Sequence, residues 1–496
     1  MAAVNWLDRA VGYVAPRAGL RRARQRAAIA MLTRSYEGAR VGRRTEGWVV
    51  AGTGANAEIG TALARLRDRS RDLVRNNPYA AKATQAVVSN LVGTGIMPRA
   101  RSIDAGANES ADRLWARFAE ACDADGLTDF SGLQALAVRA MVESGECLVR
   151  LRDRRIEDGL AVPLQLQLLE PDHLDASKTG DLPNGGFVVQ GVEFDALGRR
   201  RAYWLFPVHP GETATFQRAS LTSQPVPASS VLHLYDRLRP GQVRGVPWFA
   251  PVILKLRDLD EYDDAELVRK KIEACFAAFV TGADDEETLG PAATGAEGQR
   301  VESFEPGMIE YLAPGKDVKF ATPSSGGGYA EYMRVQLHAI AAGVGLTYEL
   351  LTGDLSQVNY SSIRAGLLEF RRRMEALQWQ LLVPGLCRPV WQRFAAAAQA
   401  IGALPAGTID AEWTAPRFEA VDPLKDIQAD ILAVRAGLMT LKEAIARQGY
   451  DPAHVLAEIG ATNGELDALG IVLDTDPRKA TKTGAAKHDD QSTLSG

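Results

Sequence analysis

The spacing of apolar positions changes along the chain and predicts different elements in different parts. Residues 1 to about 57 show only weak periodicity and are expected to form a partly ordered arm. From there to about residue 145 apolar residues recur every three to four positions, which is typical of amphipathic helices, and Asn77 can cap a helix whose first residue is Pro78. From 146 to 236 the spacing falls to two, as in Leu164-Gln-Leu-Gln-Leu168, which indicates half-buried strands. Asp195-Ala-Leu-Gly198 supplies turn residues for a hairpin. We therefore expect a helical part followed by a small, largely antiparallel β part.

The individual segments follow from the same pattern and from the turn residues between them. The proline-rich Gln224–Pro227 is expected to be a linker, and Ser131 is expected to cap the fourth helix. Helices are expected near 57–75, 77–93, 109–122 and 131–142, and strands near 147–151, 164–168, 187–194, 201–206 and 231–235.

A long and unusually polar helix is expected from Pro247 to about Phe276. Its apolar residues, among them Leu256 and Leu259, leave only a thin stripe between many charged positions. A helix with so little apolar face is not expected to bury in a monomer's core, because it gains its stability from association. The charged positions that we single out on it are Asp260, Asp263, Asp264 and Lys270.

The rest of the chain is mainly helical, which makes the predicted fold class α+β with helices predominating. The segment 283–298 is acidic, rich in glycine and without periodicity, and it contains Asp284, Asp285, Glu286 and Glu287. Helices are expected at 329–344 and at 361–402, the second kinked by Pro384 and Pro389 because each removes a helical hydrogen bond. Shorter helices follow near 423–436, 441–448 and after Pro452, and the tail from Asp474 is expected to be disordered.

Composition narrows the class of protein. With 496 residues the chain is too long for one core, and a net charge of -5 argues against a protein whose whole surface grips nucleic acid. The first 75 residues are rich in arginine, which fits either a solvated arm or an arm that contacts nucleic acid or an acidic partner surface. The four cysteines form no CxxC pair, so we expect a reducing compartment and no disulfides. No apolar run of roughly 20 residues and no signal-type segment is present, so we expect a soluble protein.

Motifs for catalysis and cofactor binding are weak or missing. Gly52-x-Gly54 lacks the third glycine of a dinucleotide fingerprint, and no GxxxxGK[ST] or GxSxG occurs. The six histidines show no HExxH or paired ligand spacing, and the consecutive carboxylates at 284–287 are of the kind that is usually solvated. We therefore expect no enzyme activity, no catalytic residue, no metal and no cofactor.

Several stretches, in this order and spacing, resemble the portal proteins of tailed double-stranded DNA phages, in particular the lambda-like branch. Each is weak alone, and together they cover most of residues 60–450. They are Arg75-Asn-Asn-Pro-Tyr-Ala-Ala-Lys-Ala83, Val92-Gly-Thr-Gly-Ile96, Ser144-Gly-Glu146, Leu168-Leu-Glu-Pro-Asp172, Pro227–Tyr235, Arg244-Gly-Val-Pro-Trp248, Pro306-Gly-Met-Ile-Glu310, Gly343–Asp354 and Asn359-Tyr-Ser-Ser362.

The resemblance implies a portal fold that assembles as a ring of about twelve copies at one capsid vertex, around a tunnel for the genome. Mapped onto this chain, it implies the following parts. They are a wing (58–245), a first stem helix (246–276), a clip (277–328), a second stem helix (329–345), a tunnel loop (346–360), a long kinked wing helix (361–412) and a helical crown (413–473). An arginine-rich, partly ordered arm (1–57) and a disordered tail (474–496) are expected from the sequence pattern alone, and they match no firm family motif.

The resemblance also implies partners and roles for residues. The partners are copies of the chain itself, double-stranded DNA, the terminase large subunit, the major capsid or scaffolding protein, and neck and tail connector proteins, in the virion and during assembly in the host cytoplasm, without a membrane. The clip carboxylates at 284–287 would dock the motor. The tunnel loop would expose Thr352, Gly353, Asp354, Ser356, Gln357 and Asn359 to DNA. Another head-tail adaptor, or a nucleic-acid enzyme that acts with the packaging motor, remains the alternative.

Overall fold

The computed structural model describes the chain from Gly52 to Leu473 with gaps, and isolated positions outside that range. The described ranges are 52–183, 185–212, 222–274, 278–281, 292–294, 300–302, 317–320, 328–356, 359–418 and 422–473. The chain divides into two units, Met1–Gly54 and Ala55–Gly496, and all elements described below belong to the second.

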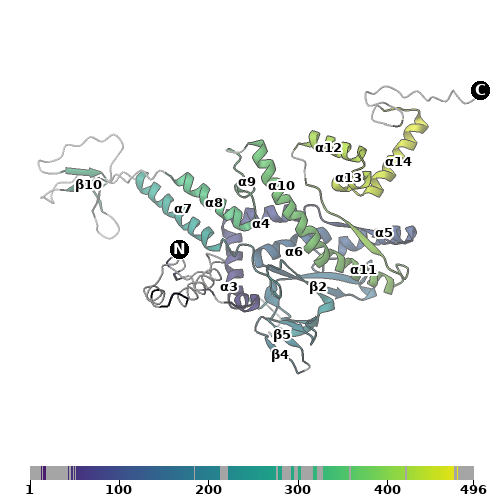
Figure 1. Ribbon diagram of the computed structural model, residues 1–496, viewed down its shortest axis with the longest axis horizontal. Coiled ribbons are helices and arrows are strands. Elements are labelled where there is room, and N and C mark those ends of the chain that lie inside the picture. Colours follow the sequence, from purple (N-terminus) through teal and green to yellow (C-terminus); the bar gives the residue numbers. More distant parts are fainter. Residues whose placement is uncertain are drawn as a thin grey trace, which may run out of the picture. The chain divides into compact units, whose positions relative to one another are not determined.

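Four helices open this unit: α3 (Ala55–Asn76), α4 (Pro78–Leu91), α5 (Ala105–Ala121) and α6 (Phe130–Ser144) (Figure 1). The predicted cap of α4 is confirmed, because the Asn77 side chain accepts hydrogen bonds from the backbone N–H groups of Tyr79 and Ala80, both at 3.0 Å. The cap predicted for α6 was wrong. Ser131 lies inside the first turn, and Asp129, with extended backbone, accepts from the Gly132 N–H at 2.8 Å instead.

A three-stranded antiparallel sheet follows, in the order β3–β2–β9. Strand β2 (Glu146–Asp153) lies in the middle, with β3 (Leu164–Leu169) and β9 (Val231–Tyr235) on either side. The alternation seen in the sequence sets the register of this sheet, since Leu166 pairs with Leu151 and both are buried.

The second sheet is antiparallel and has five short strands in sequence order. The predicted turn at 195–198 joins β6 to β7, and Gly198 N donates to Asp195 O at 2.9 Å. Two predictions were wrong here. The segment 187–194 is two strands, because Gln190 and Gly191 both have positive φ and turn the chain, and the expected linker Gln224–Pro227 is an edge strand, where proline is tolerated. The strands are β4 (Gly180–Asp181), β5 (Phe187–Val189), β6 (Val192–Phe194), β7 (Arg200–Leu205) and β8 (Gln224–Pro227).

The polar helix is α7 (Ile253–Ala274), and its later partner is α8 (Tyr329–Val344). The helix begins at Ile253, six residues after the predicted start at Pro247, because the preceding residues form turns. Between the two helices, β10 (Ala278–Thr281) pairs with β13 (Asp317–Phe320), and β11 (Ala292–Thr294) pairs with β12 (Arg300–Glu302). The carboxylates singled out at 284–287 lie outside the described residues.

The third long helix is not a single α-helix. It consists of α10 (Tyr360–Leu377), a π-helical segment (Gln378–Cys387) that contains Pro384, and α11 (Arg388–Ala400). The predicted disturbance at Pro384 is therefore a change of helix type, which absorbs the missing hydrogen bond without ending the helix. A short helix, α9 (Tyr348–Thr352), precedes α10 inside the region expected to be a loop.

The boundary predicted between the long helix and a C-terminal helical part at 413 was wrong. Residues Asp410–Thr414 form β14, which pairs with β1 (Met97–Arg101) near the start of the chain. The C-terminal helices begin ten residues later, with α12 (Pro423–Arg435), α13 (Leu441–Arg447) and α14 (Pro452–Leu469), and none of the described residues in these three helices is buried.

The main apolar core joins the helical parts. Aromatic rings from α5, α6 and α11 meet at its centre, and Trp115 lies 5.2 Å from both Phe130 and Trp391, and 5.1 Å from Phe394, between ring centroids. A smaller core lies between the two sheets, around Leu148 and Tyr203. Cys122, Cys147 and Cys387 are free and buried in these interiors, and burial raises the pKa of Cys122 to about 12. Within the described part of the chain, no helix is long and apolar enough to cross a membrane.

Candidate functional site

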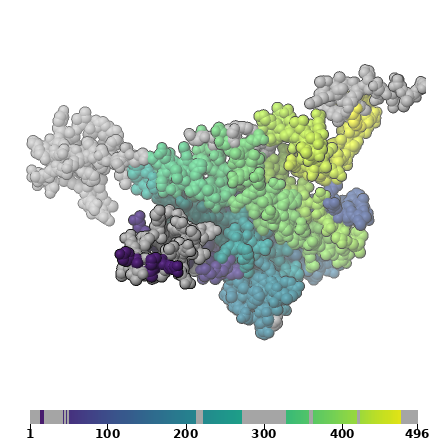
Figure 2. Space-filling view, in the orientation of Figure 1, coloured from purple at the N-terminus to yellow at the C-terminus, as the bar shows by residue number. Residues whose placement is uncertain are grey.

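The polar helix α7 runs antiparallel to α8. Lys255 Nζ donates to Gln336 Oε1 at 3.3 Å, and the ring of Tyr262 stacks on that of Tyr329 at 6.0 Å between centroids. Seven residues forward in α7 thus correspond to seven residues back in α8. In Figure 2 the teal and green atoms of the two helices lie on the visible surface.

Three tyrosines hold α7 and α8 together in the turns that lie further from the core. Tyr262 also contacts Tyr332 at 4.6 Å, and Tyr329 donates a hydrogen bond from its hydroxyl to Asp263. That hydrogen bond raises the pKa of Tyr329 to about 12, because the ionised phenol could no longer donate to the carboxylate. The hydrogen bond between Tyr329 and Asp263 is directional, so it helps to fix the register of α7 against α8 where no apolar core lies between them.

The two ends of α7 differ in burial. Leu256 and Leu259, together with Phe249 just before the helix, are buried in the main core, whereas Leu267 and Val268 are 52% and 54% exposed. The expectation that this helix stays out of the monomer's core was therefore wrong for its first two turns. Their apolar residues are spaced three to four apart and form one face, and only the later turns lack such a face.

The charged residues predicted on α7 have distinct surroundings. Asp260 accepts from Asn77 Nδ2 at 2.7 Å, which ties α7 to the cap of α4, and Asp263 accepts from Tyr329. Asp264 and Lys270 are exposed. Asp260 and Asp263 are exposed as well, and these two also position the helix through their hydrogen bonds.

The predicted loop residues stabilise helix ends. Thr352 ends α9, and its hydroxyl donates to Tyr348 O at 2.8 Å. Gly353 follows with a φ of 75°, and Asn359 caps α10 by accepting from Ser362 N at 2.9 Å. Gln357 lies outside the described residues.

Asp354 links this loop to the helix pair. Its carboxylate accepts from Ser356 N at 2.9 Å, and hydrogen bonding from Ser356 holds the pKa of Asp354 below its ordinary value. The hydroxyl of Tyr348 also donates to it at 3.3 Å, and the Tyr348 ring stacks on His338 of α8 at 4.3 Å. The loop is therefore connected to α8 through one aromatic side chain.

Sequence reasoning missed a buried ionic junction in the segment that leads into α7. Glu146, fully buried at the start of β2, accepts hydrogen bonds from the guanidinium of Arg244, at 2.6 Å from Nη2, and from His233 Nε2 at 2.9 Å. The backbone N–H of Gly245 donates to the same carboxylate at 2.8 Å. Burial alone would raise the pKa of Glu146, but Arg244 and His233 outweigh it and hold the pKa well below its ordinary value.

Two glycines allow this junction to form. A Cβ on Gly145 would lie 2.5 Å from the carbonyl carbon of Val246, and a Cβ on Gly245 would collide with the carbonyl oxygen of Gly145. Gly145 also has a φ of 90° and ends α6. The only signal in the sequence was that Ser144-Gly-Glu146 and Arg244-Gly-Val-Pro-Trp248 both belong to the family-like stretches.

A third family-like stretch reaches the same junction through ion pairs. Asp172 pairs with Arg67 at 3.1 Å and with Arg71 at 2.6 Å, and Arg67 also reaches Glu146 at 3.3 Å. The two guanidinium groups outweigh the effect of burial and hold the pKa of Asp172 below its ordinary value. Helix α3, which carries both arginines, is thus fixed to the β part and, through Glu146, to the segment that leads into α7.

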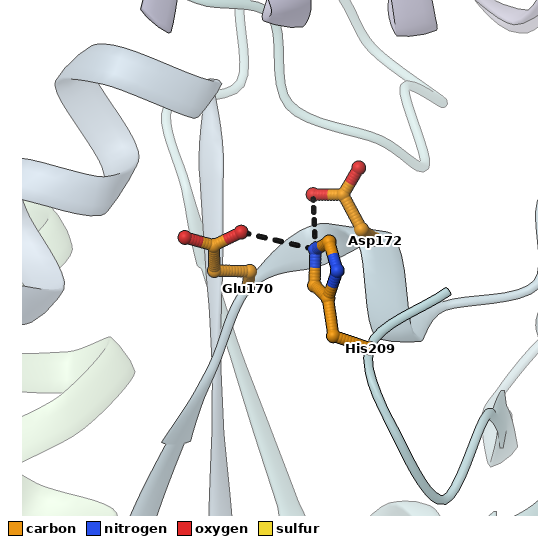
Figure 3. A group of neighbouring side chains, drawn as sticks. All are labelled: Glu170, Asp172 and His209. Carbon is orange, nitrogen blue, oxygen red and sulfur yellow. Dashed lines mark ion pairs between the residues drawn. The ribbon is translucent and has the colours of Figure 1, made fainter. Parts of the chain in front are cut away.

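His209 completes a small cluster with Glu170 and Asp172 (Figure 3). Its Nε2 lies 3.1 Å from Glu170 and 3.8 Å from Asp172, so these groups could in principle hold a cation. Both carboxylates already pair with Arg71, at 3.1 Å and 2.6 Å, and a metal ion would have to displace that guanidinium. The donor set therefore fits an ion-pair network better than a metal centre.

The chain is similar in sequence to known portal proteins of phages. The chain is 28% identical over 470 residues to the probable portal protein of Halomonas phage phiHAP-1, covering 89% of this chain and 88% of that protein. It is 25% identical over 500 residues to the portal protein of Escherichia phage N15 (91% and 93% covered) and 24% identical over 484 residues to portal protein B of Escherichia phage lambda (88% and 90% covered).

A chain in the neck of a native gene transfer agent particle, computed with C12 symmetry, aligns with a TM-score of 0.41 and 15% identity over 77% of this chain and 94% of that chain. The sequence profile of the family described as phage portal protein, lambda family, matches residues 41–378. Since that match spans more than half of its length, the chain belongs to the lambda family of phage portal proteins.

Proposed function

We propose that copies of this chain close into a ring of about twelve that forms the channel at one vertex of the capsid. Double-stranded DNA would be packaged through it by the terminase and later ejected, and neck and tail proteins would attach to it. Members of the family are structural, non-enzymatic components of the capsid, and the relatives named above are portal proteins. The protein would act in the virion, after assembly in the host cytoplasm.

One observation carries the proposal: the helix pair α7 and α8 is anchored in the core at its base and exposed beyond it. Leu267 and Val268 of α7 and Val335 of α8, 63% exposed, leave apolar surface that no other described part of the chain covers. Neighbouring copies would cover this surface, and a head-to-tail contact that repeats by rotation closes into a ring.

Within the ring, α7 and α8 would form the stem and the segment between them the clip. The carboxylates at 284–287 would dock the terminase motor, a role that rests on their sequence alone. The loop from Thr352 to Asn359 would face the DNA. It contains one acid and no base, which would let a polyanion slide, because each phosphate contact by a basic side chain adds salt-dependent affinity.

The test is electron microscopy of the purified full-length protein. Rings with a central hole of about the width of a duplex are expected. Replacing Leu267 and Val268 by aspartate should yield folded subunits that no longer form rings, while Leu197→Asp, at a 77% exposed turn position, should leave rings intact. A wild-type protein that stays a folded monomer at micromolar concentration would contradict the proposal.

A further inference from the structure

We propose that Arg373 is a positioning residue that makes the segment leading into α7 and the C-terminal end of α8, with the turn at Gly345, move as one body. This inference rests on the proposed function, in which these elements surround the DNA. Arg373 lies in α10, and its Nη1 donates to the backbone carbonyl of Val344 at 2.9 Å. Its guanidinium carbon lies 5.0 Å from the centre of the Trp248 ring. One side chain thus contacts two segments that are almost a hundred residues apart in the sequence.

The contact with α8 uses the chemistry of a helix end. Val344 is the last residue of α8, where carbonyl groups lack partners within the helix and carry partial negative charge. A guanidinium donates a charge-assisted hydrogen bond to such a carbonyl, which is stronger than a bond between neutral groups. Arg373 therefore closes the C-terminal end of α8 with a charge of the favourable sign.

Gly345 leaves the space that the guanidinium needs. It has a φ of 80°, and a Cβ on it would coincide with the position of Arg373 Nη1. Any side chain at this position would be strained and would also displace the arginine. The turn after α8 is thus shaped to receive Arg373 and not merely to end the helix.

The contact with Trp248 reaches the ionic junction. The backbone N–H of Trp248 donates to Val142 O at 3.1 Å, three residues after the Gly245 N–H binds Glu146. An arginine over the face of a tryptophan is held by attraction to the ring's negative face, and its planar guanidinium stacks there as a lysine cannot. Arg373 therefore contacts the chain at Trp248, in the segment that connects the β part to α7.

The two arginines that precede Arg373 in α10 allow the choice of a control substitution. Arg371 lies over the ring of Phe418 at 5.6 Å, and Arg372, like Arg373, is an exposed residue of the same helix. Arg372→Gln removes an equal charge from α10 without touching either Trp248 or Val344. It is the matched control for substitutions at position 373.

The experiment is hydrogen–deuterium exchange on the assembled full-length protein. Arg373→Gln should speed exchange by roughly tenfold or more in two separate segments, 246–254 and 344–354, because a charge-assisted hydrogen bond and a cation–π contact are lost together. Arg373→Lys should restore protection at 344–354 only, since an ammonium can reach the carbonyl but cannot stack on Trp248. Arg372→Gln should change neither segment.

A double-mutant cycle gives a second readout, because it measures the coupling between Arg373 and Trp248 directly. Trp248→Leu keeps apolar volume but removes the ring, and its effect on thermal stability should be strongly non-additive with that of Arg373→Gln. Additive effects, or exchange that rises evenly along α10 in both Arg373→Gln and Arg372→Gln, would overturn the inference. If the wild type forms no rings the proposed function fails, whereas unchanged exchange in variants that still form rings defeats the role of Arg373 alone.

Discussion

Glu146 shows how one side chain can hold several segments that are distant in sequence. Its carboxylate is out of contact with solvent, and it binds Arg244, which follows it by 98 residues, and His233, which follows it by 87. A buried charge is tolerated only when hydrogen bonds and opposite charges satisfy it. Arg244 and His233 are in turn satisfied by the Glu146 carboxylate.

Removing that charge should therefore be costly. Glu146→Gln keeps the shape of the side chain but leaves Arg244 buried without its counter-charge, and we expect a loss of roughly 3–5 kcal/mol in stability. Thermal or denaturant unfolding measures it, with Glu157→Gln as the control because Glu157 is exposed. If the two variants were equally stable, the ionic junction would not contribute substantially to the stability of the fold.

The same junction should make stability depend on pH. Burial lowers the pKa of His233 from its ordinary 6.5, so below pH 6.5 the unfolded chain takes up a proton that the folded chain does not. The stabilisation is thus complete above pH 6.5 and declines as the pH falls. A further loss follows below pH 4.5, the ordinary value for Glu146, whose folded pKa is lower still.

His233→Gln keeps a donor for Glu146 but cannot titrate. We expect its melting temperature to vary less than that of the wild type between about pH 5 and 8, the range in which histidine changes its charge. The acid-induced loss at lower pH should remain in both proteins. If the melting temperature of the wild type varied as little with pH as that of the variant, His233 would not be the source of the pH dependence.

Among the helices, α4 and α7 are linked through a single cap. Asn77 uses its carbonyl oxygen to cap α4 and its amide to bind Asp260 of α7. Asn77→Ala should lower stability by roughly 0.5–2 kcal/mol through the lost cap, plus the loss of the contact with α7. Asn77→Asp should keep the cap but place two carboxylates together, so that α7 is affected more than α4.

Amide exchange in the first turn of α4 and in α7 would separate these two effects. Asn76→Ala is the control, since Asn76 is exposed and its amide binds Asp72 within α3. If Asn77→Asp loosened α4 as much as Asn77→Ala does, the cap and the contact with α7 would not be separable functions of this residue.

In the assembled protein, the composition of the loop near α9 should matter for DNA movement. Inserting several lysines between Gly353 and Asn359 should hinder genome movement and leave ring assembly intact, because each added phosphate contact slows sliding. Packaging yield and ring formation by microscopy are the two measurements, and an insertion of serines of equal length is the control. Normal packaging with the lysines would count against the placement of this loop beside DNA.

The acidic segment between α7 and α8 allows a second test, which concerns how the assembled ring binds its partners. Deleting 284–297 should leave rings intact and weaken binding of the motor or of the neck proteins, because the carboxylates at 284–287 are removed with it. Pull-down of each partner with assembled rings would measure this. Unchanged binding of both partners would remove the docking role.

Local features of the chain were enough to predict much of this structure. The cap at Asn77, the alternating strand at 164–168 and the turn at 195–198 are confirmed, because each depends on neighbouring residues only. The family-like stretches also identified the kind of protein. The type of distortion at Pro384 was not predictable in this way, since a missing hydrogen bond can be absorbed by a kink or by a π-helical segment.

Only the folded chain decided which distant residues meet. Strand β14 pairs with β1, Glu146 meets Arg244, and Arg373 meets Trp248, although nothing in the periodicity near any of these residues names its partner. The same is true of α7, whose first turns are buried because other helices supply a matching apolar surface. Spacing along a sequence specifies the faces of an element, whereas the choice of what covers each face depends on packing across the whole chain.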